Sequence, residues 1–424
     1  MTHDAMTAAT PADAQPKRLL YIATRWPWPI ATGRQRMIDQ SLRFAIEGGW
    51  KVTLLYAGRR AADPKTCPLV GVEHELLPMP KLPEAAVNLA VLGGRPLQDA
   101  FFGSRLAHEQ VSATIESYDP DTIVVDMLRM AQFVEKLPKK PRGRLVLDMD
   151  DLLSVRYGRM REAGTGNVLG AFGERMPKPV RLAADFVPKA LLGIEERRMR
   201  IREREAPRIF DRTMVVSPLE AKNLGARLGR PVAAHPPAVD EMPFRNRDYA
   251  KRLRVVFLGG DNYGPNAESL LEIERVARLL AQTAPGLPIV FESAGAITRD
   301  MDLRLVRRLG FVEDLSGLFT DDAVLLAPVR SGTGVKTKVL DAMAYSVPVL
   351  TTTLGIEGIG ADPENEIVVR DRVEDLASSL LRFADHGGGH LSSIARGGWG
   401  YATRQHLRRD VRRTFLTEIG GEAA

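Results

Sequence analysis

Two successive alternations of short apolar strands with longer amphipathic segments constrain the fold of this chain more than any other feature. In the first, the apolar run Leu19–Ala23 is followed by a segment from Gly33 with apolar residues at helical spacing, and then by the apolar run Val52–Tyr56. A strand, a helix and a second buried strand in this order are typical of a parallel sheet. The further strands expected in this half are Thr122–Val125, Leu145–Leu147 and Thr213–Val216.

The second alternation starts at Leu253. Its expected strands are Arg254–Leu258, Ile289–Glu292, Ala323–Pro328, Val347–Thr351 and Glu366–Val369. Its expected helices are Ala267–Leu280, Met301–Arg308, Val335–Tyr345 and Val373–Phe383. Two such units on one chain predict an α/β protein with two doubly wound, Rossmann-like domains facing across a cleft, with ligands at the carboxyl ends of the strands.

Composition and proline placement suggest where the domains begin and end. The first residues lack hydrophobic periodicity, and the His-Pro-Pro sequence at 235–237 favours extended chain over helix. The expected segments are a disordered tail at 1–16, an N-terminal domain at 17–237 with a helical insertion at about 152–210, a linker at 238–252, a C-terminal domain at 253–388, and a terminal helix at 389–424 that packs back on the N-terminal domain.

Charge and cysteine content exclude several classes of protein. The net charge of +6 suits an anionic ligand, an anionic membrane surface or nucleic acid, and it does not choose between them. Residues 195–205 read EERRMRIRERE, and both signs at helical spacing predict a solvated helix with internal ion pairs, so we expect no nucleic-acid partner. Cys67 is the only cysteine, which excludes an intramolecular disulfide. No run approaches the roughly 20 apolar residues of a membrane span, so we expect a cytoplasmic protein.

The window from Ala327 to Pro348, APVRSGTGVKTKVLDAMAYSVP, is the most informative part of the sequence. Its glycines let the backbone approach a ligand closely, and a helix N-terminus favours an anion. Lys336 and Lys338 fall in the first turn of the expected helix, where a cation is unfavourable unless an anion is near. This placement predicts a diphosphate site. Taken alone, the window also fits an ordinary surface helix with a Lys338–Asp341 ion pair.

In this window the sequence resembles the retaining family-four GT-B glycosyltransferases (glycosyl transferases group 1), in particular an exopolysaccharide sugar-transferase-like branch. The matching residues are Pro328-Val329-Arg330, Gly332-Thr333-Gly334, Lys338 to Ala344 and Pro348-Val349. The resemblance extends to Pro265-Asn266, Gly310 to Leu315 and Gly355 to Gly358 in the C-terminal half, and more weakly to Pro27 to Arg34 in the N-terminal half.

The resemblance implies a metal-independent hexosyltransferase, without a cofactor, that moves a sugar from a nucleotide diphosphate donor to a saccharide or lipid-linked acceptor. It further implies retention of anomeric configuration, a role in polysaccharide or glycoconjugate synthesis, and weak association with the inner face of the cell membrane. The donor-site candidates are Gly33, Arg34, Gly259, Gly260, Asn266, Arg330, Ser331, Gly332, Thr333, Gly334, Lys336, Lys338, Asp341 and Glu357. The catalytic candidates among them are Arg330, Lys338 and Asp341.

The chain departs from the family at one position of the site. The family typically has two glutamates eight positions apart, and the later one contacts the donor ribose; this chain has Thr333 and Asp341 at those positions. Asp341 keeps a carboxylate, whereas Thr333 does not. The substitution predicts altered recognition of the donor sugar, and it also fits a protein that binds a nucleotide sugar without efficient transfer.

Several alternatives compete with this interpretation. Asp148-Met149-Asp150 follows an expected strand and fits a magnesium or manganese site, a structural turn or an acceptor contact. The first strand leads into Arg25-Trp26-Pro27-Trp28-Pro29 rather than a glycine-rich turn, which argues against a nicotinamide dehydrogenase. The seven histidines form no zinc or hydrolase motif. A nucleotide-sugar epimerase of the same fold and a weakly catalytic partner protein remain open.

Overall fold

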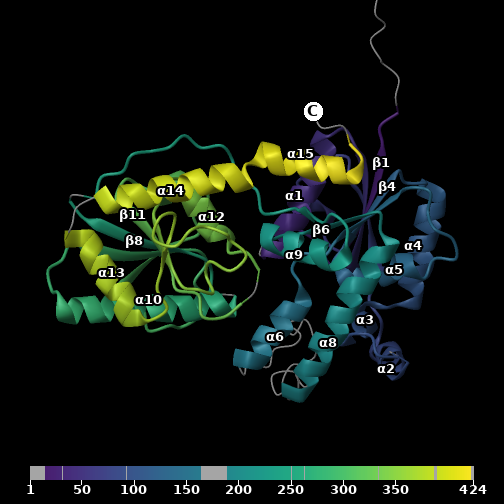
Figure 1. Cartoon of the computed structure of the whole chain (residues 1–424), viewed down its shortest axis with the longest axis horizontal. Helices are drawn as coiled ribbons and strands as arrows, with labels where there is room; N and C mark the ends of the chain where they lie inside the picture. The colour runs from purple at the N-terminus through teal and green to yellow at the C-terminus, as the bar shows by residue number, and fades with distance from the viewer. Residues whose placement is uncertain are drawn as a thin grey trace, which may run out of the picture.

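The computed structural model describes residues 15–30, 32–91, 93–163, 189–249, 251–261, 263–332, 334–385 and 389–421. It has two lobes, each built on a parallel sheet with helices on both faces (Figure 1). The prediction of two doubly wound α/β domains is therefore confirmed. Most of the expected tail at 1–16, the middle of the expected insertion, and Thr333 lie outside the described residues.

The N-terminal lobe contains a seven-stranded sheet in the order β3-β2-β1-β4-β5-β6-β7, and every pair is parallel. Its strands are β1 Arg18–Ala23, β2 Lys51–Gly58, β3 Glu73–Pro78, β4 Thr122–Asp126, β5 Arg144–Asp148, β6 Arg212–Val215 and β7 Ala233–Ala234. Its helices are α1 Gly33–Glu47, α2 Leu82–Ala90, α3 Leu97–Phe102, α4 Arg105–Tyr118, α5 Gln132–Glu135, α6 Leu153–Ala163, α8 Lys189–Glu205 and α9 Pro218–Leu228.

The central strand β1 shows why this sheet is buried on both faces. Leu20 and Ile22 point into the core on one face, and Leu19 and Tyr21 point into the core on the other. Alternate side chains of a strand lie on opposite faces, so a continuous apolar run requires helices on both sides. The carboxyl end of β1 is thereby held in a fixed position next to the start of α1.

The C-terminal lobe contains a six-stranded parallel sheet in the order β10-β9-β8-β11-β12-β13. Its strands are β8 Leu253–Leu258, β9 Ile289–Ala294, β10 Val306–Gly310, β11 Ala323–Ala327, β12 Val349–Thr351 and β13 Val368–Val369. Its helices are α10 Gly264–Thr283, α11 Leu315–Leu318, α12 Thr337–Ala344, α13 Val373–Asp385 and α14 Gly389–His406, and α15 Arg408–Ile419 ends the described chain.

The expected helix Met301–Arg308 is wrong, because residues 301–305 form neither helix nor strand and the chain continues as the edge strand β10 beside β9. Leu303, Val306 and Leu309 recur every three residues, and this spacing suits a helix face as well as an irregular strand. In the structure Val306 packs into the core on one face of the sheet, whereas Leu309 packs against the core on the other. The spacing of these residues fits both a helix and a strand, and packing against the core selects the strand.

The charged helix α8 is less solvated than its sequence suggested. Arg198–Glu195 and Arg200–Glu196 are the expected pairs within one helix. Arg202, however, is buried and forms ion pairs with Asp99 and Glu135, which belong to the lobe's main body. The prediction of a solvated helix with internal pairs is therefore correct for one face of α8 only.

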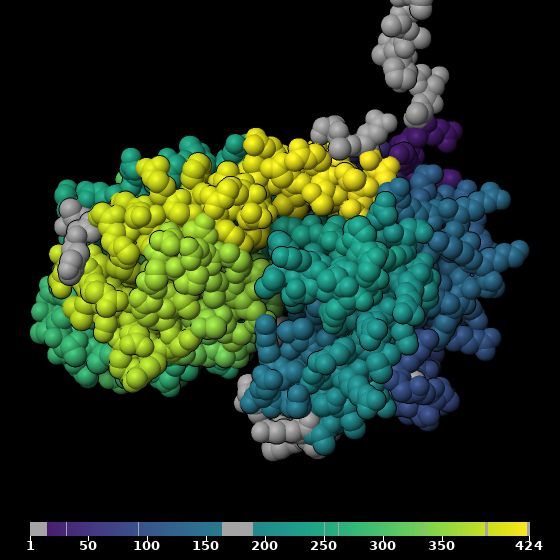
Figure 2. All heavy atoms as spheres, in the orientation of Figure 1, coloured from purple at the N-terminus to yellow at the C-terminus, as the bar shows by residue number. Residues whose placement is uncertain are grey.

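The chain passes between the lobes at two adjacent places. The segment after β7 crosses first, and Val239 pairs there with Leu407, where α14 gives way to α15. The α14 helix packs on the C-terminal lobe, and α15 buries Phe415 and Ile419 against the N-terminal lobe. In the space-filling view these last helices run as a yellow band across both lobes (Figure 2).

Among the described residues, no helix is both long enough and apolar enough to cross a bilayer.

Candidate nucleotide-binding site

The turn between β11 and α12 has the backbone geometry that an anion site requires. Gly332 and Gly334 have φ values of +94° and +78°, in the left-handed region that favours glycine. A Cβ atom on Gly332 would lie 2.9 Å from the Tyr263 hydroxyl, so a larger residue there would require the tyrosine side chain to move. Helix α12 begins at Thr337, two residues later than expected, and its N-cap Lys336 makes no side-chain cap hydrogen bond. The first backbone N–H groups of α12 therefore make no hydrogen bond to the Lys336 side chain, and they can donate to a ligand.

Lys338 lies in the first turn of α12 without a carboxylate partner among the described residues. Its Nζ donates to Asn266 Oδ1 at 2.7 Å and lies 4.1 Å from the centre of the Phe257 ring. Burial and, to a smaller extent, the nearby charge of Lys336 together lower its pKa to about 7. A buried ammonium that is held by an amide and a ring, with no counter-ion, favours an incoming anion.

Lys336 adds a second cation to the same place. Its Nζ donates to the carbonyl of Gly334 at 2.6 Å, inside the turn. Burial lowers its pKa to about 8, and Arg156 of the N-terminal lobe acts in the same direction. Burial is the main cause of both shifts, and an anion beside the two lysines would favour their charged forms.

The loop after β8 supports Lys338 from the side. Asn266 donates through Nδ2 to the carbonyl of Gly260 at 2.9 Å, so one amide side chain links this loop to Lys338. Gly259 has φ +154°, and a Cβ atom there would lie 2.7 Å from Asn266 Nδ2. Three predicted site residues, Gly259, Gly260 and Asn266, therefore meet at the carboxyl end of β8, next to α12.

Two other predicted residues of the turn point toward α10. Arg330 forms an ion pair with Glu272 at 3.1 Å and donates to the carbonyl of Asp371. Ser331 donates to Glu268 at 2.5 Å. These contacts brace the outside of the turn, so contact of either side chain with phosphate stays a prediction.

Asp341 and Glu357, the predicted ribose carboxylates, lie where the lobes meet and are both held by N-terminal arginines. Asp341 accepts two hydrogen bonds from Arg36 of α1, at 2.9 and 3.0 Å. Glu357 forms an ion pair with Arg159 of α6. The structure thus brings both carboxylates to the boundary beside Lys336, and their contact with ribose stays a prediction.

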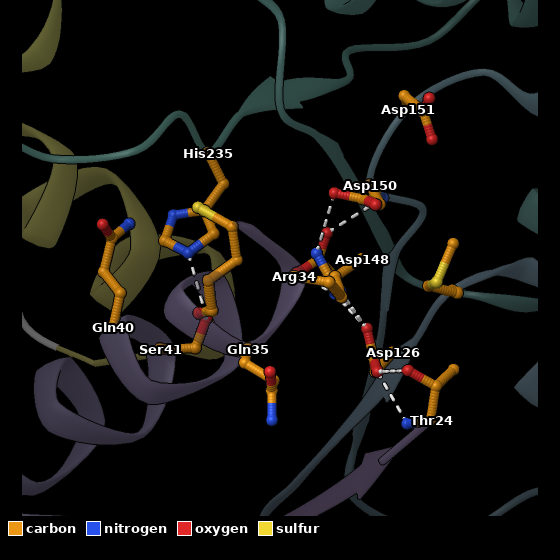
Figure 3. A network of polar contacts seen from close by, with 12 residues as sticks. Thr24, Arg34, Gln35, Gln40, Ser41, Asp126, Asp148, Asp150, Asp151 and His235 are labelled. Carbon is orange, nitrogen blue, oxygen red and sulfur yellow. Dashed lines mark hydrogen bonds and ion pairs between the residues drawn. The ribbon is translucent and has the colours of Figure 1, made fainter. Parts of the chain in front are cut away.

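Arg34, the predicted phosphate contact from the N-terminal lobe, is enclosed by carboxylates (Figure 3). It forms ion pairs with Asp126 at the end of β4, with Asp148 at 3.0 Å and with Asp150 at 3.2 Å. Its side chain is only 6% exposed. Burial opposes its charge, yet the three carboxylates raise its pKa well above the usual value. In this arrangement Arg34 could reach a phosphate only by leaving these partners.

Gly33 precedes Arg34 at the start of α1, and its backbone does not explain the glycine. A Cβ atom placed on Gly33 would meet nothing within 4 Å. The helix start is defined instead by Thr32, whose hydroxyl accepts from the Gln35 amide. A phosphate contact at Gly33 therefore stays a prediction.

The Asp148–Asp150 turn fits a metal site by sequence, and in the structure both carboxylates form ion pairs with Arg34. Asp150 has φ +65°, an uncommon conformation for a residue other than glycine, and its amide donates to Asp148 Oδ1. Burial raises the pKa of Asp150 to about 6, although Arg34 opposes the shift. Within the described ranges, no group of three or more His, Cys, Asp or Glu residues could hold a metal ion.

Sequence reasoning missed Arg36, Arg159, Phe257 and Asp126. Asp126 could have been found from the sequence, because it ends a buried strand and two neighbouring strands of the predicted sheet also end in polar residues. Phe257 read as ordinary core within an apolar strand. The two arginines had no signal, because their partners depend on how the lobes face each other.

Comparison with known proteins identifies the C-terminal lobe. Residues 252–386 match the protein family described as glycosyl transferases group 1. No match was found among curated protein sequences.

Similar solved structures extend over both lobes. Sucrose-phosphate synthase from Thermosynechococcus elongatus is 13% identical with a TM-score of 0.61, covering 93% of this chain and 96% of that chain. HepE from Anabaena, in complex with UDP and glucose, is 11% identical with a TM-score of 0.58, covering 95% and 99%. WaaG, a glycosyltransferase involved in lipopolysaccharide biosynthesis, is 14% identical with a TM-score of 0.56, covering 95% and 100%. The chain has the GT-B fold, and its C-terminal lobe matches the model of the group 1 glycosyltransferases over residues 252–386.

Proposed function

We propose that this chain is a hexosyltransferase that moves a sugar from a nucleotide diphosphate donor to a saccharide or lipid-linked acceptor, with retention of anomeric configuration. The observation that carries the proposal is the pair Lys336 and Lys338 beside the glycine turn of the group 1 domain. Both lysines have lowered pKa values, and Lys338 has no carboxylate partner within the described chain. A diphosphate would supply the missing negative charge.

The same groups suit the chemistry of the leaving group. When the donor's glycosidic bond breaks, negative charge grows on the β-phosphate oxygen. Two ammonium groups and the first amides of α12 would stabilise that charge, and they are already in place before the reaction. Their total charge allows the reaction to proceed without a metal ion, as we propose.

The N-terminal lobe would then hold the acceptor near Asp148–Asp151. Carboxylates suit the hydroxyl groups of a saccharide as hydrogen-bond acceptors. The basic net charge of +6 supports weak association with an anionic membrane surface, where a lipid-linked acceptor would be reached. A role in polysaccharide or glycoconjugate synthesis follows from such an acceptor.

A thermal shift series with UDP, ADP, GDP and their sugar derivatives tests donor binding. UDP is the first choice because the similar HepE structure contains UDP. Ligand at 100 times its Kd would stabilise the protein by about 2.7 kcal/mol. The matched variant Lys338→Ala should lose most of the shift while its ligand-free unfolding temperature stays close to that of the wild type. No shift with any nucleotide would contradict the proposal.

Product analysis then separates the three functions that remain open for this fold. A new glycosidic product shows transfer, and an altered nucleotide sugar without acceptor shows epimerisation. Nucleotide-sugar binding with neither product would indicate a partner protein without activity of its own. The anomeric configuration of the product tests retention.

A further inference from the structure

Arg36 is one of two N-terminal arginines that form ion pairs with predicted residues of the candidate nucleotide site; the other is Arg159, which pairs with Glu357. The Arg36 guanidinium holds Asp341 through two parallel hydrogen bonds of 2.9 and 3.0 Å, and it also donates to the carbonyl of Ala238 at 3.3 Å. Helix α1, the segment between the lobes and helix α12 therefore meet at one side chain. Planar, two-pronged recognition of this kind suits a phosphate as well as a carboxylate.

The two arginines at the start of α1 differ in their freedom to change partners. Arg34 is enclosed by three carboxylates of its own lobe and is 6% exposed (Figure 3). Arg36 has one carboxylate partner in the described chain, on the other lobe, and is 31% exposed. If Arg34 moved, three carboxylates would lose their shared cation. If Arg36 moved, Asp341 would be the one carboxylate to lose its ion-pair partner.

Arg36 also stands close to the phosphate turn. Asp341 follows Lys338 by three residues on α12, which is about one helical turn, or roughly 5 Å along the axis. The guanidinium on Asp341 is thus about one turn from the cation that would face the diphosphate. Burial opposes the positive charge of Arg36, and the pair with Asp341 offsets that effect and raises its pKa.

We propose that Arg36 is the N-terminal lobe's ligand for the donor diphosphate, and that it exchanges Asp341 for phosphate when the nucleotide binds. This inference rests on the proposed function, because it needs a nucleotide diphosphate in the site. Donor ribose hydroxyls take over the Asp341 carboxylate, and the freed guanidinium moves to the phosphate oxygens. Each group exchanges one partner for another, so no charged group is left unpaired. The phosphate-binding role expected of Arg34 therefore belongs to Arg36.

The test is a double-mutant cycle that measures UDP affinity by calorimetry. If thermal shift selects another base, the corresponding diphosphate, ADP or GDP, replaces UDP. The four proteins are wild type, Arg36→Ala, Asp341→Asn and the double variant. Arg36→Lys is added because it keeps the charge but not the planar fork. Arg43→Ala is the matched control, since Arg43 lies on the same helix and pairs with Asp39 of its own lobe.

The effect of Arg36→Ala in the Asp341→Asn background distinguishes direct phosphate binding by Arg36 from positioning of Asp341. If Arg36 binds the diphosphate, Arg36→Ala weakens UDP binding by about tenfold or more in both backgrounds, Arg36→Lys restores part of the loss, and Arg43→Ala changes little. If Arg36 only positions Asp341, its loss costs less than about twofold once Asp341 is replaced, and the inference is overturned. A wild-type protein that binds no nucleotide diphosphate at all would instead overturn the proposed function.

Discussion

Binding of a nucleotide diphosphate should weaken steeply between pH 7 and pH 9, because the free protein holds Lys338 with a pKa of about 7. A diphosphate beside the ammonium favours its charged form and raises its pKa. Binding therefore takes up a proton wherever the free lysine is neutral and the bound lysine is charged. Affinity is therefore highest below the pKa that Lys338 has in the free protein, and it falls as pH rises above that value.

The pKa of Lys338 in the free protein sets the size of the change in Kd. Half of the Lys338 side chains are protonated at pH 7, and about 1% are protonated at pH 9, so Kd should rise about 50-fold over this range through Lys338 alone. Lys336, with a pKa of about 8, would add to the change at the upper end of the range.

Calorimetry with UDP at constant ionic strength measures the change in Kd, and repeating it in buffers with different ionisation enthalpies counts the protons taken up. The matched variant is Lys338→Arg, because arginine stays protonated throughout. It should remove the Lys338 contribution, and it shares every titration of the ligand itself. A wild-type Kd that does not change between pH 7 and pH 9, or a dependence that Lys338→Arg leaves unaltered, would refute the reasoning.

Three further predictions concern the metal, the buried Arg34 cluster and the departure from the family pattern. EDTA should leave most transferase activity intact, whereas loss of activity that manganese restores would make Asp148 and Asp150 the donor site. Arg34→Met removes the cation shared by the buried Asp126 and Asp148 and the partly buried Asp150, and it should lower the free energy of unfolding by about 3 to 5 kcal/mol. Arg43→Ala should cost about 1 kcal/mol or less, and equal denaturant midpoints for these two variants would contradict this. Thr333→Glu should change the relative use of competing nucleotide sugars more than it changes affinity for the bare nucleotide diphosphate, and no change in either would place Thr333 outside the sugar pocket.

Local sequence predicted the parts of the site that lie within one supersecondary unit. The glycines after β11 and the lysines at the start of α12 could be read directly, because backbone freedom and helix-end charge are properties of neighbouring residues. The strand β10 could not be read, because Leu303, Val306 and Leu309 fit two structures and only the packing of the sheet selects one.

The residues at the lobe boundary could not be predicted for a different reason. Arg34 and Arg36 are two positions apart on α1, yet one pairs within its own lobe and the other reaches α12. The partners of Arg34 are 92, 114 and 116 residues away in the chain, and the carboxylate partner of Arg36 is 305 residues away. No local pattern encodes such a choice, because it depends on the orientation of two separately packed domains.

The position of α15 has a consequence for the order in which the protein can fold during synthesis. Phe415 lies against Phe44 and stacks on His235, so the last helix completes a core whose other buried members belong to the N-terminal lobe and are translated before the C-terminal lobe. The ribosome must therefore finish the whole C-terminal lobe before the N-terminal lobe can bury this face of its sheet. Until then, the apolar side chains that α15 covers stay exposed on the nascent chain, where a chaperone could bind them.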